Sequence, residues 1–412
     1  MEIMFLMTTV MFFAIMIVLF IWVGMVFVFF IRPRKTAESG DIFGTTIVIP
    51  AYNEEKNIGD CLESIKQSDF PKSKLEVIVV DDGSSDRTVE IAEKFGAKII
   101  KQGHEGKVAA LNEGIKNSMY DLVVTMDADT ILEPGALSEI VKPMIDENVG
   151  AVSGVSKVIN KNGILGLFQN VEYIYLEFIR ETVSNLLRTS PGIRGAFSCF
   201  RKEAINKAGG FDDRTSAEDF DIAFHMKKAG YKILLAPKAI SHTIVPDTLK
   251  GLFNQRFRWS KGILQSIFLH RDMFGRSGSA SYVLGVHFFW YVIALFSIPL
   301  IAYNVLYWLP FNMATPLDVF SYFFRWFSFA GIVHMIYMIP EWGINIVYIF
   351  GIISGIITII LMGIAHNRYN EKITLRVIIG MFFYFPYTIL LNLTLIGGIL
   401  YFAIKKGKGN FS

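Results

Sequence analysis

The chain has 412 residues, of which 52% are apolar and 14% aromatic, and its mean hydropathy is +0.42. This composition excludes a single ordinary soluble domain. A formal net charge of +3 is too small to indicate nucleic acid as a partner. The two distant cysteines, Cys61 and Cys199, offer neither a disulfide framework nor a metal site, and they fit a reducing compartment as packing residues.

Charge-free segments at both ends of the chain predict membrane spans. Residues 3–31 contain no Asp, Glu, Lys or Arg, and segments 277–317, 342–367 and 377–404 each exceed the roughly 20 residues that cross a bilayer. The acidic start at Glu2 and the long apolar run favour a retained anchor over a cleaved signal peptide. The predicted organisation is a transmembrane helix in 1–34, a soluble domain in 35–250, an interfacial amphipathic region in 251–276, a membrane region in 277–404 and a basic tail in 405–412.

The basic flanks predict the orientation. Basic residues in 32–35 and in 405–408 follow the first and last spans, so both flanks and the soluble domain are expected in the cytosol of a multi-pass plasma-membrane protein. Segment 319–340 carries Arg325 and His334 and could lie in the interface instead of spanning. If it spans, the basic loop at 368–376 lies outside; if it does not, the C-terminal lysines lie outside. Three or four later spans therefore remain open.

The soluble domain alternates strand patterns with helical patterns. Short β-branched apolar runs stand at 45–50, 75–80, 97–100 and 121–126, and helix-like segments separate them. Continuous apolar strands of this kind are buried on both faces. We therefore predict a Rossmann-like α/β domain with a mostly parallel sheet and helices on each side.

Acidic residues follow two of these strands. Asp81 and Asp82 come directly after 75–80, and Asp127 and Asp129 directly after 121–126. Ligands bind at the carboxyl ends of such strands, and two carboxylates at i and i+2 could hold one hard divalent cation on a diphosphate. Turn or helix-cap roles are the alternative, which we favour for Asp86.

The first strand ends in "IPAYNEE". Tyr52 offers an aromatic face for a base at the strand exit, although core tyrosines are common. Asn53, Glu54 and Glu55 are expected to begin a helix.

Six motifs in this order resemble the family 2 inverting glycosyltransferases. They are "IVIPAYNEEKNIGDCLESI", "VVDDGSSDRT", "GKVAALNEGI", "MDADT", "AGGFDD" with "AEDFDIAFHMKKAGY", and "QRFRW". Within that family the chain looks like the membrane-embedded processive polysaccharide synthases, of the poly-N-acetylglucosamine, hyaluronan, chitin or cellulose synthase type. The resemblance covers about residues 45–262, and it implies a GT-A fold, a nucleotide-diphosphate sugar donor and Mg²⁺ or Mn²⁺.

The resemblance also implies roles for individual residues. Asp219 would be the catalytic base, and Asp127 and Asp129 would hold the metal ion. The implied donor-binding residues are Tyr52 on uracil, Glu54, Asp82 on the uracil edge, Lys107, Asp127, Gln255 and Arg258. The implied acceptor-binding residues are Gly195, Glu218 and Trp259.

The chemistry of glycosyl transfer explains these residue types. An acceptor hydroxyl is a poor nucleophile, so a carboxylate such as Asp219 must take its proton. Glu218 and Asp221 crowd Asp219, and like charges raise the pKa of at least one carboxyl group. Complementing the helix dipole is the alternative role for these acids. The departing diphosphate needs cations, which Lys107 and the metal ion could supply, although Lys107 could also be an ordinary surface lysine.

Two further segments carry softer signals. Helical spacing places Gln255, Arg258 and Trp259 on one face, and we expect Arg256, displaced from that face, to meet lipid headgroups together with Lys261. The segment "SHTIVPDTL" resembles a loop that closes over the donor, or is an ordinary connection. The family usually has a basic residue at His225, so the contact made there is in doubt.

These features predict a processive synthase that extends a polysaccharide and passes it through its own membrane helices, with UDP-N-acetylglucosamine as the expected donor. A single-addition transferase acting on a lipid-linked acceptor is the alternative. A transporter or scaffold is a third reading, which the intact acidic motifs disfavour. Expected partners are the nucleotide sugar, the growing polysaccharide or lipid-linked acceptor and membrane lipids, with a small membrane subunit left open.

Overall fold

A computed structural model describes residues 43–308, 330–342 and 346–407, with isolated positions in 1–42 and 309–329. The predicted transmembrane helix in 1–34 therefore lies outside the described residues, apart from those isolated positions. Arg325 and the end of the basic tail, 408–412, also lie outside them.

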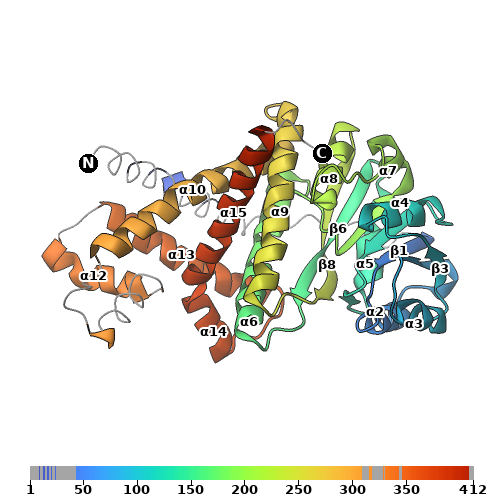
Figure 1. Cartoon of the computed structure of the whole chain (residues 1–412), viewed down its shortest axis with the longest axis horizontal. Coiled ribbons are helices and arrows are strands. Elements are labelled where there is room, and N and C mark those ends of the chain that lie inside the picture. Colours follow the sequence, from blue (N-terminus) through green and yellow to red (C-terminus); the bar gives the residue numbers. More distant parts are fainter. Residues whose placement is uncertain are drawn as a thin grey trace.

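An eight-stranded sheet forms the core of the domain, in the order β3-β2-β1-β4-β7-β6-β8-β5 (Figure 1). The strands are β1 (Thr45–Ala51), β2 (Leu75–Asp81), β3 (Lys98–Lys101), β4 (Leu122–Met126), β5 (Ile131–Leu132), β6 (Val149–Val158), β7 (Phe197–Arg201) and β8 (Lys232–Thr243). The four strand patterns found in the sequence are thus β1 to β4.

The first half of the sheet is parallel, as expected. β1 pairs with β2 on one side and with β4 on the other, and the register sets Ala51 opposite Asp81. The ends of the acid-bearing strands therefore lie at one edge of the sheet.

The second half makes the sheet mixed: β6 and β8 pair in parallel, and six of the eight strands run in one direction as expected, but two strands are reversed. β7 runs antiparallel to both β4 and β6, and β5 runs antiparallel to β8. Apolar patterning predicts that a strand is buried but does not encode its direction, which depends on where the preceding helix leaves the chain.

Helices cover both faces of the sheet. They are α2 (Ile58–Lys66), α3 (Thr88–Lys94), α4 (Lys107–Lys116), α5 (Ala136–Val141), α7 (Lys202–Ala208) and α8 (Glu218–Lys228), with 3₁₀ turns at Lys72–Lys74, Lys142–Ile145 and Arg271–Met273. Ile47 and Ile49 of β1 pack with α2 and α5, whereas Val48 packs with α4, α7 and α8. Alternate residues of one strand thus enter two separate cores, which explains why the strand is apolar throughout.

Long helices form the rest of the molecule. They are α6 (Ile164–Leu187), α9 (Leu249–Leu269), α10 (Gly278–Trp308), α12 (Ala330–Trp342), α13 (Ile346–Arg368), α14 (Leu375–Phe382) and α15 (Tyr384–Gly407). Figure 1 shows α9 and α15 side by side next to the sheet domain, with α10, α12 and α13 extending away from it. Packing of α9 on α15 is close, because a Cβ at Gly398 would lie 2.3 Å from Ser260 Oγ.

Within the described residues, two helical segments are long and apolar enough to cross a membrane, Gly278–Ile298 and Pro386–Ile404. A shorter apolar helix runs over Ile352–Arg368.

The loop between α13 and α14 is fastened to the sheet domain. Lys157 of β6 donates to Tyr369 O at 2.9 Å and pairs with Glu371 at 3.4 Å, and Lys161 pairs with Glu371 at 2.9 Å. Arg368 makes a bidentate pair with Glu181 of α6. This loop, whose side of the membrane the sequence left open, is therefore in direct contact with the sheet domain.

Candidate active site

A cleft of about 270 Å³ opens where β1, β2 and β4 end. Its lining comprises Pro50, Ala51, Tyr52, Glu54, Asp82, Lys107, Asp127, Ala128 and Asp129. The structure therefore brings together the six residues that follow β1, β2 and β4 or begin α4 and that the resemblance assigned to the donor or the metal: Tyr52, Glu54, Asp82, Lys107, Asp127 and Asp129. A hollow of about 240 Å³ beside α2 contains none of them.

Tyr52 lies on a tight turn that the sequence pattern did not predict. The segment from Asn53 to Glu55 does not begin a helix, because α2 starts at Ile58. Asn53 has a left-handed φ of 55°, and its carboxamide accepts from Ser85 N at 2.9 Å. The turn leaves Tyr52 46% exposed at the cleft, with its ring 4.2 Å from that of His104.

The carboxylate of Asp82 is buried and holds the loop that leads to Lys107. It accepts from Gln102 Nε2 at 2.7 Å, from Glu105 N at 2.8 Å and from Gly106 N at 3.0 Å. Burial alone would raise the pKa of Asp82, but these hydrogen bonds lower it. The ionised carboxylate of Asp82 thus holds the loop before α4 in place, and Asp82 also lines the cleft.

Lys107 joins the acidic pair that follows β4 to the first turn of α8. Its Nζ lies 2.7 Å from Asp127 Oδ1 and 3.2 Å from Glu218 Oε1. Burial opposes the ammonium charge, but Asp127 and Glu218 outweigh it and raise the pKa of Lys107. Lys107 is therefore a permanent cation in the cleft and not an unattached surface lysine.

Asp129 carries negative charge that this lysine does not fully balance. Burial, then Asp127 and Glu54, raise the pKa of Asp129 to about 7. Carboxylate oxygens in such a cleft are ligands that Mg²⁺ and Mn²⁺ accept, and a cation there would offset the repulsion. The residues present therefore fit the metal ion that the resemblance implies.

Asp219 sits in the first turn of α8, 24 residues after Gly195 in sequence but in direct contact with it. Its Oδ2 accepts from Gly195 N at 2.7 Å, and its Oδ1 accepts from Phe220 N at 2.8 Å. Burial and the charge of Glu218 raise the pKa of Asp219. Lys107 and these two N–H groups lower it, but they do not cancel the increase. A raised pKa suits a carboxylate that must accept a proton near neutral pH.

The "QRFRW" motif lies on α9 and contributes no residue to the lining of the cleft. Gln255, Arg258 and Trp259 do not belong to that lining, and Arg258 is exposed. Trp259 packs against a small cluster of Val158, Tyr173 and Val245.

The expectation that Arg256 meets lipid headgroups is wrong. Arg256 is 7% exposed, pairs with Glu172 of α6 at 2.8 Å and lies 4.3 Å from the ring centroid of Trp259. Tyr387 of α15 donates to the same Glu172. Helical spacing separated Arg256 from the Trp259 face, but α6 and α15 cover the side to which it points.

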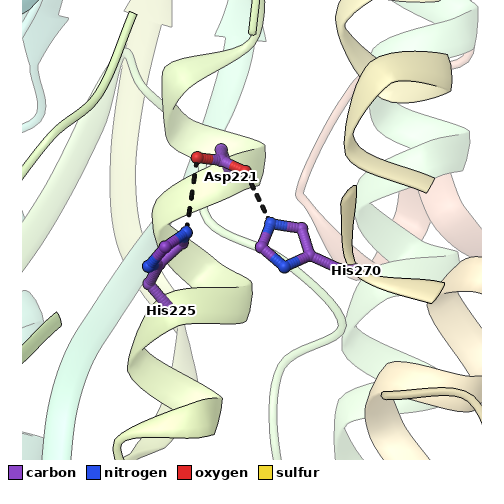
Figure 2. A group of neighbouring side chains, drawn as sticks. All are labelled: Asp221, His225 and His270. Atoms are coloured by element: carbon purple, nitrogen blue, oxygen red, sulfur yellow. Dashed lines mark hydrogen bonds and ion pairs between the residues drawn. The ribbon is translucent and has the colours of Figure 1, made fainter. Parts of the chain in front are cut away.

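A second polar cluster connects α8 with the end of α9 (Figure 2). His270 Nε2 lies 2.6 Å from Asp221 Oδ1, and His225 Nε2 lies 3.7 Å from Asp221 Oδ2. These atoms could hold a metal ion, but Arg214 already donates to Asp221 Oδ2 at 3.1 Å and contacts His225. A guanidinium in that place repels a divalent cation, so the cluster is an ion-paired joint between two helices.

Sequence reasoning missed several residues around the site. His104, His270 and Arg194 stand outside the acidic and basic motifs, and each meets its partner only through tertiary packing. For His104, its position between Asp82 and Lys107 in the chain was the one available signal.

The sequence of this chain was compared with known protein families and with curated proteins. Residues 46–209 match the family model for Glycosyl transferase family 2. A poly-beta-1,6-N-acetyl-D-glucosamine synthase from Staphylococcus epidermidis is 31% identical over 258 residues, which are 58% of this chain and 61% of the relative. The synthase of the same name from Staphylococcus aureus (strain COL) is 32% identical over 261 residues, 62% of each protein. The match thus spans less than two thirds of these relatives.

One solved structure shares the fold over most of the chain. It is a mannosyltransferase from Pyrobaculum calidifontis in complex with GDP-Man and Mn²⁺, with a TM-score of 0.62 and 19% identity. The likeness covers 90% of this chain and 99% of that chain. This likeness shows the fold, and the sequence matches show that residues 46–209 form a glycosyl transferase family 2 domain and that this part of the chain is similar to the poly-beta-1,6-N-acetyl-D-glucosamine synthases.

Proposed function

We propose that this protein is a metal-dependent inverting glycosyltransferase that extends a polysaccharide from a nucleotide-diphosphate sugar. The observation that carries the proposal is the juxtaposition, through Lys107, of the cleft carboxylate Asp127 with the segment that holds Glu218 and Asp219. A donor diphosphate and an acceptor-activating carboxylate are the two parts that such a transfer needs.

We assign the roles of the residues from their positions together with the family resemblance. Tyr52 presents its ring for the nucleotide base, Lys107 attracts the diphosphate, and Asp127 with Asp129 would hold Mg²⁺ or Mn²⁺, which neutralises charge on the leaving group. Asp219 accepts the proton of the attacking hydroxyl. The family resemblance assigns Gly195, Glu218 and Trp259 to the acceptor side and Gln255 with Arg258 to the donor.

The substrate and the cellular setting belong to the same proposal. Homology to the N-acetylglucosamine polymer synthases favours UDP-N-acetylglucosamine as donor and repeated addition over single addition to a lipid-linked acceptor. The two apolar helices, with the further span expected in 1–34, support a multi-pass membrane protein with a cytosolic catalytic domain.

The test uses the full chain in lipid nanodiscs with a panel of labelled nucleotide sugars. We expect turnover of UDP-N-acetylglucosamine into products of many sugars, sized by gel electrophoresis, with linkage analysis giving the bond formed. Asp219→Asn should lower turnover by about 10²–10⁴-fold while UDP binding stays unchanged. Products with a single added sugar would contradict the assignment as a polymerase. Wild-type turnover in Asp219→Asn would show that Asp219 is not the catalytic base.

A further inference from the structure

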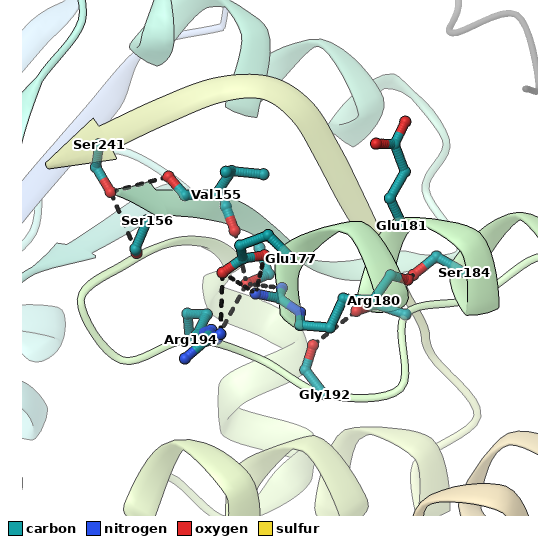
Figure 3. Close-up of polar contacts among 12 residues, drawn as sticks. Val155, Ser156, Glu177, Arg180, Glu181, Ser184, Gly192, Arg194 and Ser241 are labelled. Carbon is teal, nitrogen blue, oxygen red and sulfur yellow. Dashed lines mark hydrogen bonds and ion pairs between the residues drawn. The ribbon is translucent and has the colours of Figure 1, made fainter. Parts of the chain in front are cut away.

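The segment that supplies the Gly195 N–H to Asp219 is itself held by a buried charge cluster (Figure 3). Glu177 of α6 has no exposed surface, and its carboxylate forms ion pairs with two arginines. Arg180 donates to it at 2.8 Å and Arg194 at 3.0 Å. Removing either arginine would leave the buried Glu177 charge less well compensated, so the two ion pairs hold the side chains of Arg180 and Arg194 against Glu177.

Arg194 is fixed by its main chain as well. Its N–H donates to Ser153 Oγ at 3.0 Å, and its carbonyl accepts from Ser198 Oγ at 2.6 Å. Arg180 donates to the same Ser153 Oγ at 2.9 Å. Side chain, N–H and carbonyl of Arg194 are therefore tied to α6, β6 and β7 respectively, and the next residue in the chain is Gly195.

The base has little freedom beside this segment. A Cβ placed on Gly195 would lie 3.1 Å from Asp219 Oδ2, so the backbone and the carboxylate are already in close contact. A shift of a few tenths of an ångström in residues 194–195 would change the direction in which Asp219 Oδ2 points.

We propose that Arg194, held by Glu177, is a positioning residue that aims the Asp219 carboxylate at the acceptor hydroxyl through the Gly195 N–H. The proposal rests on the proposed function, because it assigns no role to Arg194 unless Asp219 is the base. Arg194 does not touch the donor cleft, so its effect is expected on transfer and not on nucleotide binding.

The experiment compares Arg194→Ala, Arg194→Lys and Glu177→Gln with a matched control, Glu181→Gln. Glu181 lies one turn along the same helix and is also buried and ion-paired, but its partners are Arg368 and Tyr369 and not Arg194. All four full-length variants are measured in nanodiscs with the donor that the wild type turns over. UDP binding in Mn²⁺ is the second readout.

We expect Arg194→Ala to lower kcat by about 10–100-fold, because small misplacement of a catalytic group has effects of that size. Arg194→Lys should recover part of the loss, Glu177→Gln should lie between them, and UDP affinity should stay within about twofold in all of these variants. The Gly195 N–H lowers the pKa of Asp219. Its loss should therefore move the acid limb of the pH profile of kcat to higher pH, because the base must be ionised.

The proposal is overturned by wild-type kcat and pH profile in Arg194→Lys and Glu177→Gln, by an equal loss in Glu181→Gln, or by an equal loss of UDP binding. If Arg194→Ala does not fold, the other two variants decide in the same way. Failure of the proposed function would look different: the wild type would not transfer sugar, or Asp219→Asn would remain active.

Discussion

At the scale of single residues, the site depends on a close contact between Gly195 and Asp219. Gly195 donates its N–H to the Asp219 carboxylate, and a Cβ at Gly195 would lie 3.1 Å from Asp219 Oδ2. We expect Gly195→Ala to push Asp219 aside and lower kcat by roughly 10-fold or more, with unchanged UDP binding. Steady-state kinetics beside a UDP titration would check this. Gly192→Ala is the control, because a Cβ there meets nothing within 4 Å. Equal activity in both variants would contradict the prediction.

The acidic pair is the second feature at this scale. Asp127 already has Lys107 as a partner, whereas burial, together with repulsion by Asp127 and Glu54, raises the pKa of Asp129 to about 7. We therefore expect chelation by EDTA to abolish transfer and Mn²⁺ or Mg²⁺ to restore it. Asp129→Asn should raise the metal concentration that gives half-maximal rate, measured by titration. Full activity in EDTA would contradict a metal requirement.

At the scale of elements, buried ion pairs fix the helices relative to one another. Asp221 of α8 is 2% exposed and holds His270 at the end of α9. Burial opposes its charge, but the hydrogen bond from His270 and the charges of His270 and Arg214 lower the pKa of Asp221. A carboxylate with a lowered pKa stabilises the fold above its unfolded pKa of about 4, and this contribution is lost as pH falls through the folded value.

Asp221→Asn should therefore lower the free energy of unfolding by about 1.5–3 kcal/mol at pH 7. The difference from wild type should stay constant down to about pH 5 and shrink below about pH 4, since wild-type Asp221 then takes up a proton. Thermal unfolding in detergent across this range is the measurement. Asp272→Asn, which breaks the exposed pair with Lys228, should change little. If the difference in stability between wild type and Asp221→Asn grew as the pH falls, the lowered pKa of Asp221 would be contradicted.

α6 is the element that joins the parts. Three of its glutamates are buried and each meets an arginine from another segment: Glu172 meets Arg256 of α9, Glu177 meets Arg194, and Glu181 meets Arg368 of α13. One helix therefore sets the position of the "QRFRW" helix, of the segment beside the base and of a long apolar helix.

At the scale of the whole molecule, the fastened loop after α13 bears on topology. Residues 369–374 are tied to the sheet domain by Lys157 and Lys161. We expect exposed Lys372 and exposed Asp213 of the domain to lie on the same side of the membrane. Lys372→Cys and Asp213→Cys should both react with an impermeant maleimide in inside-out vesicles and neither in intact cells. The native cysteines are buried, which keeps background labelling low. Labelling of Lys372→Cys alone in intact cells would contradict this topology.

The sequence by itself determined what local pattern and chain order can specify. Apolar strand patterns predicted β1 to β4, and parallel pairing then brought Tyr52, Asp82, Asp127 and Asp129 to one edge of the sheet. Each of these residues lies within three positions of the end of its strand, so the order of the chain was enough to predict their placement.

Tertiary structure decided what depends on contacts between distant segments. The direction of β7, the burial of Arg256 on Glu172 and the cluster of Glu177 with Arg194 all follow from where α6 lies. The helix expected at Asn53 failed because Ser85 holds that residue in a left-handed turn. A charged residue in a sequence can lie on the surface, in an ion pair or in a functional site. For Arg256, the packing of α6, α9 and α15 selects the ion pair, because a buried charge needs a partner.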